Sequence, residues 1–145
     1  MKYVIRTALV ASAFAGGVLF GRSFGGQQQA HAAPQTRVFE IRTYTAPDGK
    51  LDALNARFRN HTTRLFEKHG MQNIGYWIPQ DSILSQNTLV YILAHESREA
   101  ARQSWAAFGR DPEWRQVARE SEANGRIVAR IESRFLEPTD YSPMK

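Results

Sequence analysis

Cysteine is absent from this chain of 145 residues, which excludes disulfides, thiolate metal sites and a cysteine nucleophile. Net charge is also low once a leader segment is set aside. Three of the 19 basic residues, Lys2, Arg6 and Arg22, lie in that segment, so the rest carries 16 basic and 14 acidic residues, a net charge of +2. So small an excess does not favour a nucleic-acid binder. The length suits one domain, and a hydrophobic content of 42% is typical of a folded chain.

The sequence also lacks the common catalytic motifs. It contains no glycine-rich phosphate loop, no Ser-His-Asp signature and no spacing of His, Asp or Glu that is typical of a metal site. We therefore expect neither a cofactor nor a bound metal ion, and no single residue identifies a reaction.

The first 32 residues have the features of a secretory signal peptide. Lys2 and Arg6 give a positively charged start, and residues 7–20 form a run of 14 residues without charge. Ala30 and Ala32 then place small residues at the two positions that a signal peptidase reads. We expect cleavage after Ala32, and therefore a periplasmic or secreted protein without a stable membrane anchor.

The alternative is a leader that stays uncleaved and anchors the protein. A membrane-spanning helix needs about 20 apolar residues, whereas Gly16, Gly17 and Arg22 interrupt the apolar run here. The composition of the leader therefore favours cleavage over anchoring. Residues 33–37 would then form a short N-terminal arm, residues 38–137 the folded domain and residues 138–145 a C-terminal tail.

Hydrophobic periodicity and turn residues predict the elements of the folded domain. The expected strands are residues 38–44, 72–78, 88–95 and 127–136. The expected helices run over about residues 50–69, from a Ser97 cap to Gly109, and from Pro112, capped by Asp111, to Gly125. The order β-α-β-β-α-β predicts an α+β, ferredoxin-like fold, in which one four-stranded antiparallel sheet carries helices on one face only.

Period-two alternation divides each expected strand into two faces. Glu40, Arg42 and Tyr44 share one face of the first strand, and we assign this face to the side that the helices leave open. The last strand offers three more charged residues to that side, namely Arg130, Glu132 and Arg134. Because the first and last strands are neighbours in this topology, we expect opposite charges to pair between them.

The hairpin of residues 72–95 is apolar on both faces. Tyr76 and Tyr91 belong to one set of side chains, and Trp77 and Val90 belong to the other, although alternation does not say which set faces the helices. Helices on one side of the sheet cover only one of these faces. An apolar patch left open usually marks an interface, so we expect a face-to-face homodimer in which a second copy covers the hairpin.

Several segments resemble the NIPSNAP family. They are VFEIRTY at residues 38–44, GKLD at 49–52, EKHG at 67–70 with GYW at 75–77, and DPEW at 111–114. The resemblance extends from Val38 to about Leu136 and implies a dimeric α+β barrel, which agrees with the interface expected above. It implies little chemistry. Better-known eukaryotic members are associated with mitochondria and with vesicle or autophagy partners, a role that the signal peptide makes inapplicable here.

His61 is the first candidate for chemistry. It lies three residues after Phe58 and four before Leu65, on the apolar stripe of the first helix, so we expect it to face the sheet. There it would be either a hydrogen-bonded core histidine or part of a pocket lining. His69 would lie about 12 Å further along the helix, too far to share a metal ion, and reads as a partner of the helix C-terminus. His95 should lie opposite His69, at the edge of the sheet where that helix starts.

Arg42 and Tyr44 are the second candidates, because an arginine and a tyrosine beside an apolar hairpin can hold a carboxylate or carbonyl group of a small ligand. The alternative is that Arg42 merely forms a cross-strand ion pair. Arg64 and Lys68 lie one helical turn apart and should be solvated. Trp114, just after the expected start of the last helix, should turn into the core.

Two functions remain open. The first is a non-enzymatic module that binds a small apolar molecule or a protein. The second is a cofactor-independent enzyme of the dimeric α+β barrel type, monooxygenase- or isomerase-like, that acts on a small apolar organic substrate. In that case His61 would be the general base, and Arg42 and Tyr44 would orient the substrate. The sequence favours the first function, because none of its polar residues stands out.

Overall fold

The computed structural model describes residues 37–145. The expected signal peptide, its cleavage site and most of the N-terminal arm lie outside the described residues. The elements are β1 (Val38–Thr45), α1 (Leu51–Arg57), the π-helix η1 (Phe58–Thr62), α2 (Thr63–Lys68), β2 (Gln72–Trp77), the short 3₁₀ helix η2 (Leu84–Gln86), β3 (Thr88–His95), α3 (Arg98–Arg110), α4 (Pro112–Ser121) and β4 (Arg130–Leu136). This order confirms the predicted β-α-β-β-α-β plan, with the second helical region divided into α3 and α4.

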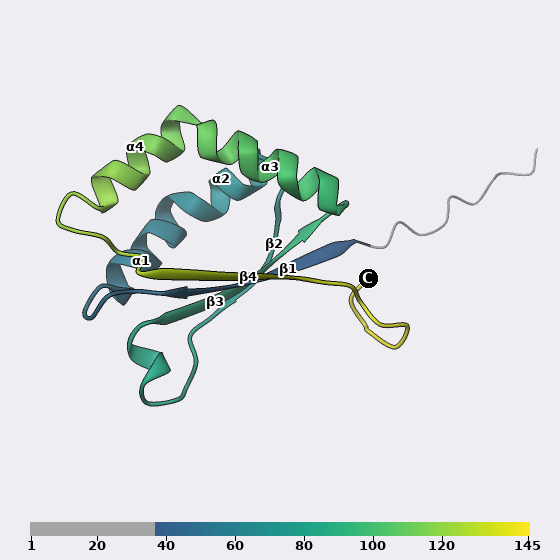
Figure 1. The fold of residues 1–145 in the computed structure, drawn as a ribbon, viewed down its shortest axis with the longest axis horizontal. Coiled ribbons are helices and arrows are strands. Elements are labelled where there is room, and N and C mark those ends of the chain that lie inside the picture. Colours follow the sequence, from purple (N-terminus) through teal and green to yellow (C-terminus); the bar gives the residue numbers. More distant parts are fainter. Residues whose placement is uncertain (1–36) are drawn as a thin grey trace, which may run out of the picture. The chain divides into compact units, whose positions relative to one another are not determined.

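The four strands form one antiparallel sheet in the order β2-β3-β1-β4. The helices α1, α2, α3 and α4 all lie on one side of this sheet, as Figure 1 shows. The arrangement confirms the ferredoxin-like α+β fold. None of these four helices covers the opposite face of the sheet. Within residues 37–145, no helix is long and apolar enough to cross a membrane.

The predicted helix starts are confirmed at α3 and α4. The Ser97 hydroxyl accepts a hydrogen bond from the amide of Ala100 at 3.0 Å, and the Asp111 carboxylate accepts one from the amide of Glu113 at 2.8 Å. These bonds satisfy amides that a helix N-terminus otherwise leaves free. Pro112 stands at the start of α4, where the N–H that it lacks would have no partner within the helix.

The first helix is continuous but contains a turn of π-helix. Thr62 lies in η1, and its hydroxyl donates a hydrogen bond to the carbonyl of Arg57, five residues earlier, at 3.2 Å. Thr62 is buried and His61 is exposed. The expectation that His61 faces the sheet is therefore wrong. The apolar stripe passes from Phe58 directly to Thr62, and the widened turn of η1 leaves position 61 on the outer side.

The faces of β1 are opposite to the prediction. Glu40 pairs with Leu93 of β3, and Tyr44 pairs with Leu89, and both leucines belong to the core under the helices. Glu40 and Tyr44 are themselves buried. Glu40, Arg42 and Tyr44 thus face the helices, so their assignment to the open side is wrong. Alternation separated the two sets of side chains correctly. Because carboxylates are rarely buried, we assigned the set that contains Glu40 to the exposed face.

The charged residues of β4 do lie on the open side. Glu132 pairs in register with Thr43 of β1, on the face opposite to Arg42. Glu132 forms ion pairs with Arg130 at 3.0 Å and with Arg134 at 3.4 Å. The expected pairing between β1 and β4 is therefore wrong, because the charges of β4 pair within their own strand and those of β1 face the helices.

Trp77 and Val90 face the open side of the sheet. They lie opposite each other in register, and Tyr76 and Tyr91 form the adjacent pair, which points to the helix side. Tyr91 is fully buried, whereas Trp77 remains half exposed (50%). The Trp77 ring lies over Gly75, where an added Cβ would come within 2.5 Å of the indole. The indole therefore lies flat along the open face.

Candidate functional site

Glu40 is a buried carboxylate at the centre of a polar network on the helix side of the sheet. Its Oε1 accepts hydrogen bonds from Arg42 Nη1 and from Ser133 Oγ, each at 2.6 Å. Its Oε2 accepts one from Trp105 Nε1 at 2.7 Å and lies 3.1 Å from His95 Nε2. We call these five residues the Glu40 network. It joins β1, β3, β4 and α3.

The partners of Glu40 keep its carboxylate ionised. Burial by itself would raise the pKa of this group, but hydrogen bonds, that of His95 foremost, together with the charge of Arg42 outweigh burial and lower the pKa to about 2. A negative charge is therefore fixed inside the protein. Its direct consequence is that the Arg42 side chain is held in one place by a short ion pair.

Arg42 is positioned from three sides. Nη1 binds Glu40, Nη2 lies 3.4 Å from the Tyr44 hydroxyl, and the guanidinium lies 4.2 Å from the centroid of the Trp105 ring. Nε is buried without a hydrogen-bond partner among the described residues. Burial would lower the pKa of Arg42, but the phenolic groups of Tyr44 and Tyr91 and the carboxylate beside it raise it above its usual value. The side chain is thus a fixed cation with one unsatisfied donor, Nε, among the described residues.

The side of this site towards β4 is open. Ile131 and Ser133 pair in register with Tyr44 and Arg42, so they point to the same side of the sheet. Both are exposed, Ile131 with 48% of its surface accessible. Arg42 itself keeps 14% of its side chain accessible. Arg42 therefore reaches the surface beside β4.

The structure does not bring His61 to Arg42 and Tyr44. His61 lines a groove between the first helix and α4, together with the buried side chains of Arg57 and Val117. Arg42 and Tyr44 do not line this groove. Of the two alternatives for His61, the pocket lining is closer to the observed position, but the pocket is a different one from that expected.

His95 and His69 lie at the same end of the sheet. Ala94 pairs with Gln72, which begins β2 soon after the first helix ends. His95 therefore lies at the end of the sheet where that helix finishes, and the expectation of the opposite edge is wrong. The antiparallel hairpin returns β3 to the start of β2, which is the reason. In the described part of the chain, no three His, Asp or Glu side chains are placed to hold a metal ion.

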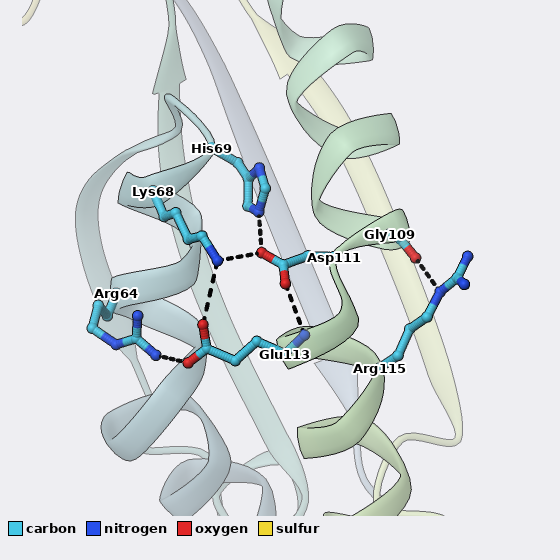
Figure 2. A network of polar contacts seen from close by, with 7 residues as sticks. All are labelled: Arg64, Lys68, His69, Gly109, Asp111, Glu113 and Arg115. Carbon is cyan, nitrogen blue, oxygen red and sulfur yellow. Dashed lines mark hydrogen bonds and ion pairs between the residues drawn. The ribbon is translucent and has the colours of Figure 1, made fainter.

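Arg64 and Lys68 are not simply solvated, as the sequence suggested, but form ion pairs with the start of α4 (Figure 2). Lys68 Nζ lies 2.8 Å from Asp111 and 3.3 Å from Glu113, and Arg64 also pairs with Glu113. His69 Nε2 lies 2.7 Å from the Asp111 oxygen that Lys68 contacts. We call these five residues the Asp111 network. Spacing along one helix does not predict these pairs, because the partners belong to distant segments.

Sequence reasoning assigned no role to Arg57, which is buried at 6% exposure. This residue follows Leu54 by three positions and precedes Phe58, so it occupies the apolar stripe of the first helix. A charged residue at such a position indicates a buried ion pair or a binding site. His95 and Trp105 give no comparable signal, because their positions in a strand and an amphipathic helix are ordinary for these residue types.

The family model described as NIPSNAP matches residues 39–143 of the chain. The protein belongs to the NIPSNAP family. This confirms the resemblance that the sequence segments indicate. The curated proteins include no match to the chain.

Solved structures of other NIPSNAP proteins share the fold. A family member of unknown function from Agrobacterium tumefaciens is 20% identical, with a TM-score of 0.67 over 78% of this chain and 97% of the other. A NIPSNAP-like domain protein from Burkholderia xenovorans is 19% identical, with a TM-score of 0.65 over 75% of this chain and 90% of the other. A monooxygenase from Streptomyces coelicolor, solved with nanaomycin D, is 14% identical, with a TM-score of 0.54 over 78% and 96%. These likenesses confirm the α+β fold.

Proposed function

We propose that this NIPSNAP protein is an exported homodimer that binds a small organic molecule through Arg42 and Tyr44. The observation that carries the proposal is the Arg42 guanidinium, which Glu40 and Trp105 hold in place while its Nε stays buried without a partner in the described chain. A buried donor without a partner is unfavourable. A ligand oxygen beside Arg42 would complete its hydrogen bonding.

The surroundings of Arg42 indicate the chemistry of the ligand. A fixed guanidinium with a free N–H binds a carboxylate or a carbonyl oxygen, and the Tyr44 hydroxyl beside it offers a second hydrogen bond. The Trp105 ring and the exposed Ile131 provide apolar surface for the rest of the molecule. The proposed ligand is therefore small and mostly apolar, with one oxygen-bearing group at Arg42.

The open face of the sheet supports the dimer. Trp77, Val90 and Ile41 present apolar side chains on this face, and the helices lie on the other side (Figure 1). A standard interface buries about 800 Å² per partner, and a two-fold axis allows the same patch to cover itself. Because Arg42 and Tyr44 face the helices, the ligand and the second copy would occupy opposite faces of the sheet.

Sedimentation at micromolar concentration tests the dimer. A charge within the patch, Val90→Asp or Trp77→Asp, should release monomers, whereas Ala106→Asp on the exposed side of α3 should leave the dimer intact. An unmodified mature protein that sediments as a monomer contradicts the dimer. A monomer would not contradict the proposed Arg42 site, because that site lies within one chain.

The leader supports export, with cleavage after Ala32 and a periplasmic or secreted location. N-terminal sequencing of the protein isolated from its own cells tests this. A chain that begins near Ala33 and is released with the soluble fraction agrees with the proposal. A chain that retains the leader and stays with the membrane agrees with the anchored alternative instead.

Native mass spectrometry of the protein purified from its own periplasm tests the ligand. We expect a dimer that carries a small organic molecule. Arg42→Met should lose this molecule, and Arg102→Met, which changes an exposed arginine of α3, should keep it. A native protein that carries no small molecule, or an Arg42→Met variant that retains it, contradicts the site.

The second candidate function is a cofactor-independent enzyme, monooxygenase- or isomerase-like, that uses the same site. The buried Tyr91 hydroxyl favours it, because together with Tyr44 and Arg42 it can stabilise negative charge that develops on a substrate oxygen. His61 is not placed to act as the general base there, since it lines the groove beside α4. A bound molecule recovered chemically changed after incubation in air would favour the enzyme, and one recovered unchanged would favour the binding protein.

A further inference from the structure

A groove between the first helix and α4 is separate from the Arg42 site. Its volume is about 270 Å³. Its apolar lining comes from Ala53, Ala56 and Val117, and its polar lining includes Arg57 and Glu120. The groove therefore has room for a small organic molecule.

Arg57 is a buried cation whose charge is incompletely compensated. Its Nη1 lies 3.3 Å from Ser121 Oγ and 3.4 Å from Glu122 Oε1, both long contacts. Its Nε is buried and has no partner within residues 37–145, and the guanidinium lies 5.2 Å from the centroid of the Trp114 ring. Burial lowers the pKa of Arg57, and the charge of Glu122 only opposes that shift. A negatively charged group in the groove beside the guanidinium would add to its charge pairing.

The π-helix η1 forms one wall of this groove. It supplies Asn60 and His61 to the lining, and its widened turn buries Thr62. π turns are rare inside α-helices and frequently occur at functional sites. Here the irregular turn places an amide and an imidazole in the same groove as the Arg57 guanidinium. The regular α-helix is thus interrupted where it lines the groove, directly after Arg57.

The opposite wall carries negative charge. Glu120 of α4 is exposed and lines the groove, and its Oε1 accepts a hydrogen bond from Gln116 at 2.8 Å. A simple anion at Arg57 would be repelled by Glu120 and Glu122, and a simple cation would be repelled by Arg57. A molecule with one charge of each sign can place its anionic group at Arg57 and its cationic group at Glu120, so that attractions offset these repulsions.

We propose that this groove binds a small α-amino acid with an apolar side chain. Its carboxylate binds Arg57, its ammonium group is directed at Glu120, and its side chain packs on Ala53 and Val117. This site does not depend on the ligand proposed for Arg42. It also lies within one chain, so it does not depend on the dimer.

An NMR titration of the isotope-labelled mature protein with three probes tests this proposal. L-Leucine, isocaproate and isoamylamine share an apolar body and differ in their charged groups. We expect leucine to shift the amide signals of Asn60, His61 and Val117 at millimolar concentration, and each of the other probes to bind at least about tenfold more weakly. Isocaproate that binds as well as leucine, or leucine that shifts no groove signal up to its solubility, overturns the proposal.

Variants locate the binding. Arg57→Met and Glu120→Gln should each weaken leucine binding at least about tenfold, and Arg59→Met, which changes an exposed arginine of η1 outside the groove, should leave it unchanged. Because loss of a buried arginine can unfold the chain, Ala53→Phe is a further variant that fills the groove and keeps every charge. Leucine binding that survives Ala53→Phe or Glu120→Gln overturns the proposal.

Discussion

The Glu40 network and the Asp111 network both centre on a buried, ionised carboxylate, but the Asp111 network extends to exposed side chains such as Lys68 and Arg64. Glu40 is 1% exposed, and its partners are all side chains. Asp111 also accepts the backbone amide of Glu113, and its partner Lys68 is half exposed (47%). As Figure 2 shows, Asp111 joins the end of α2 to the start of α4.

The two environments lower the two carboxyl pKa values by different means. For Glu40, hydrogen bonds must overcome a large opposing effect of burial. For Asp111, hydrogen bonds from Lys68 and His69 dominate, and burial is a lesser, opposing effect. Exposed ion pairs contribute little and are screened by salt, whereas a buried charge that loses its partner is costly. Loss of a charge from the Glu40 network should therefore lower the free energy of unfolding more than loss of a charge from the Asp111 network, which links two helices.

Glu40→Gln should have the largest effect. The amide cannot neutralise Arg42, which would remain charged inside the protein. Removal of one partner of a buried ion pair costs about 3–5 kcal/mol, and we expect the free energy of unfolding, measured by urea denaturation, to fall by an amount in this range. Glu96→Gln, at the exposed neighbour of His95, is the control and should change it by less than about 0.5 kcal/mol. Equal stability of the two variants would remove the distinction between buried and surface carboxylates.

Trp114→Ala should rank second. The Trp114 ring lies 4.4 Å from the Phe108 ring, centroid to centroid, and gives α4 an apolar anchor beside the polar anchor of Asp111. Loss of a fully buried tryptophan costs about 3–5 kcal/mol, and because this ring is only partly buried we expect about 2 kcal/mol by urea denaturation. Trp114→Phe keeps the aromatic contact and should lose less. A loss smaller than that of Asp111→Asn would reverse our ranking of the two anchors.

Low pH should lower the free energy of unfolding because it protonates Glu40. The pKa of its carboxyl group is lowered from 4.5 to about 2, so the unfolded state binds more protons than the folded state between these values. The stability that ionised Glu40 contributes is complete above about pH 4.5 and is lost as the pH falls towards 2. Urea denaturation across this range should show a decline in the native protein and a shallower decline in Glu40→Gln. Parallel declines would contradict the role of Glu40.

Most of the fold was predictable because its determinants are local. Ser97, Asp111 and Pro112 mark the starts of helices within a few residues of chain. The alternating apolar residues of the hairpin predicted strands over residues 72–78 and 88–95, and β2 and β3 agree with these bounds to within one residue. Each of these signals can be read from a short stretch of sequence without knowledge of what packs against it.

The site was only partly predictable. The sequence placed Arg42 and Tyr44 on one face of the first strand, and Arg42 Nη2 does lie 3.4 Å from the Tyr44 hydroxyl. The face that they occupy was not predictable, because Glu40 can be buried only where donors from β3, α3 and β4 meet it, and these donors are distant in the chain. The spacing of apolar residues also does not predict the π turn that moves His61 out of the apolar stripe. Residues three or four positions apart both lie on one face of a helix, so either position 61 or position 62 could be the buried one.

Asp111→Asn should have a smaller effect than Trp114→Ala. Asparagine still caps a helix, so the substitution removes only the charge that Lys68 and His69 contact. We expect a modest loss of stability at low salt that becomes smaller at high salt, because salt reaches the half-exposed Lys68 and weakens its pair with Asp111 in the native protein. Thermal unfolding at two salt concentrations measures this. A loss of the same size at both salt concentrations would mean that salt does not screen the pair of Asp111 with Lys68.

Arg64→Met should have the smallest effect, and it separates the rim of the Asp111 network from its centre. Arg64 is more than half exposed (57%), and its partner Glu113 is also bound by Lys68. Methionine keeps the helix propensity and the aliphatic stem, so the substitution removes little besides an exposed charge. We expect an unchanged unfolding temperature at high salt and a drop at low salt that is smaller than that of Asp111→Asn, measured in the same thermal unfolding series. Lys68 still neutralises Glu113 in this variant, so we expect little loss. A drop in unfolding temperature as large as that of Asp111→Asn would mean that the ion pairs of Glu113 stabilise the network as much as those of Asp111.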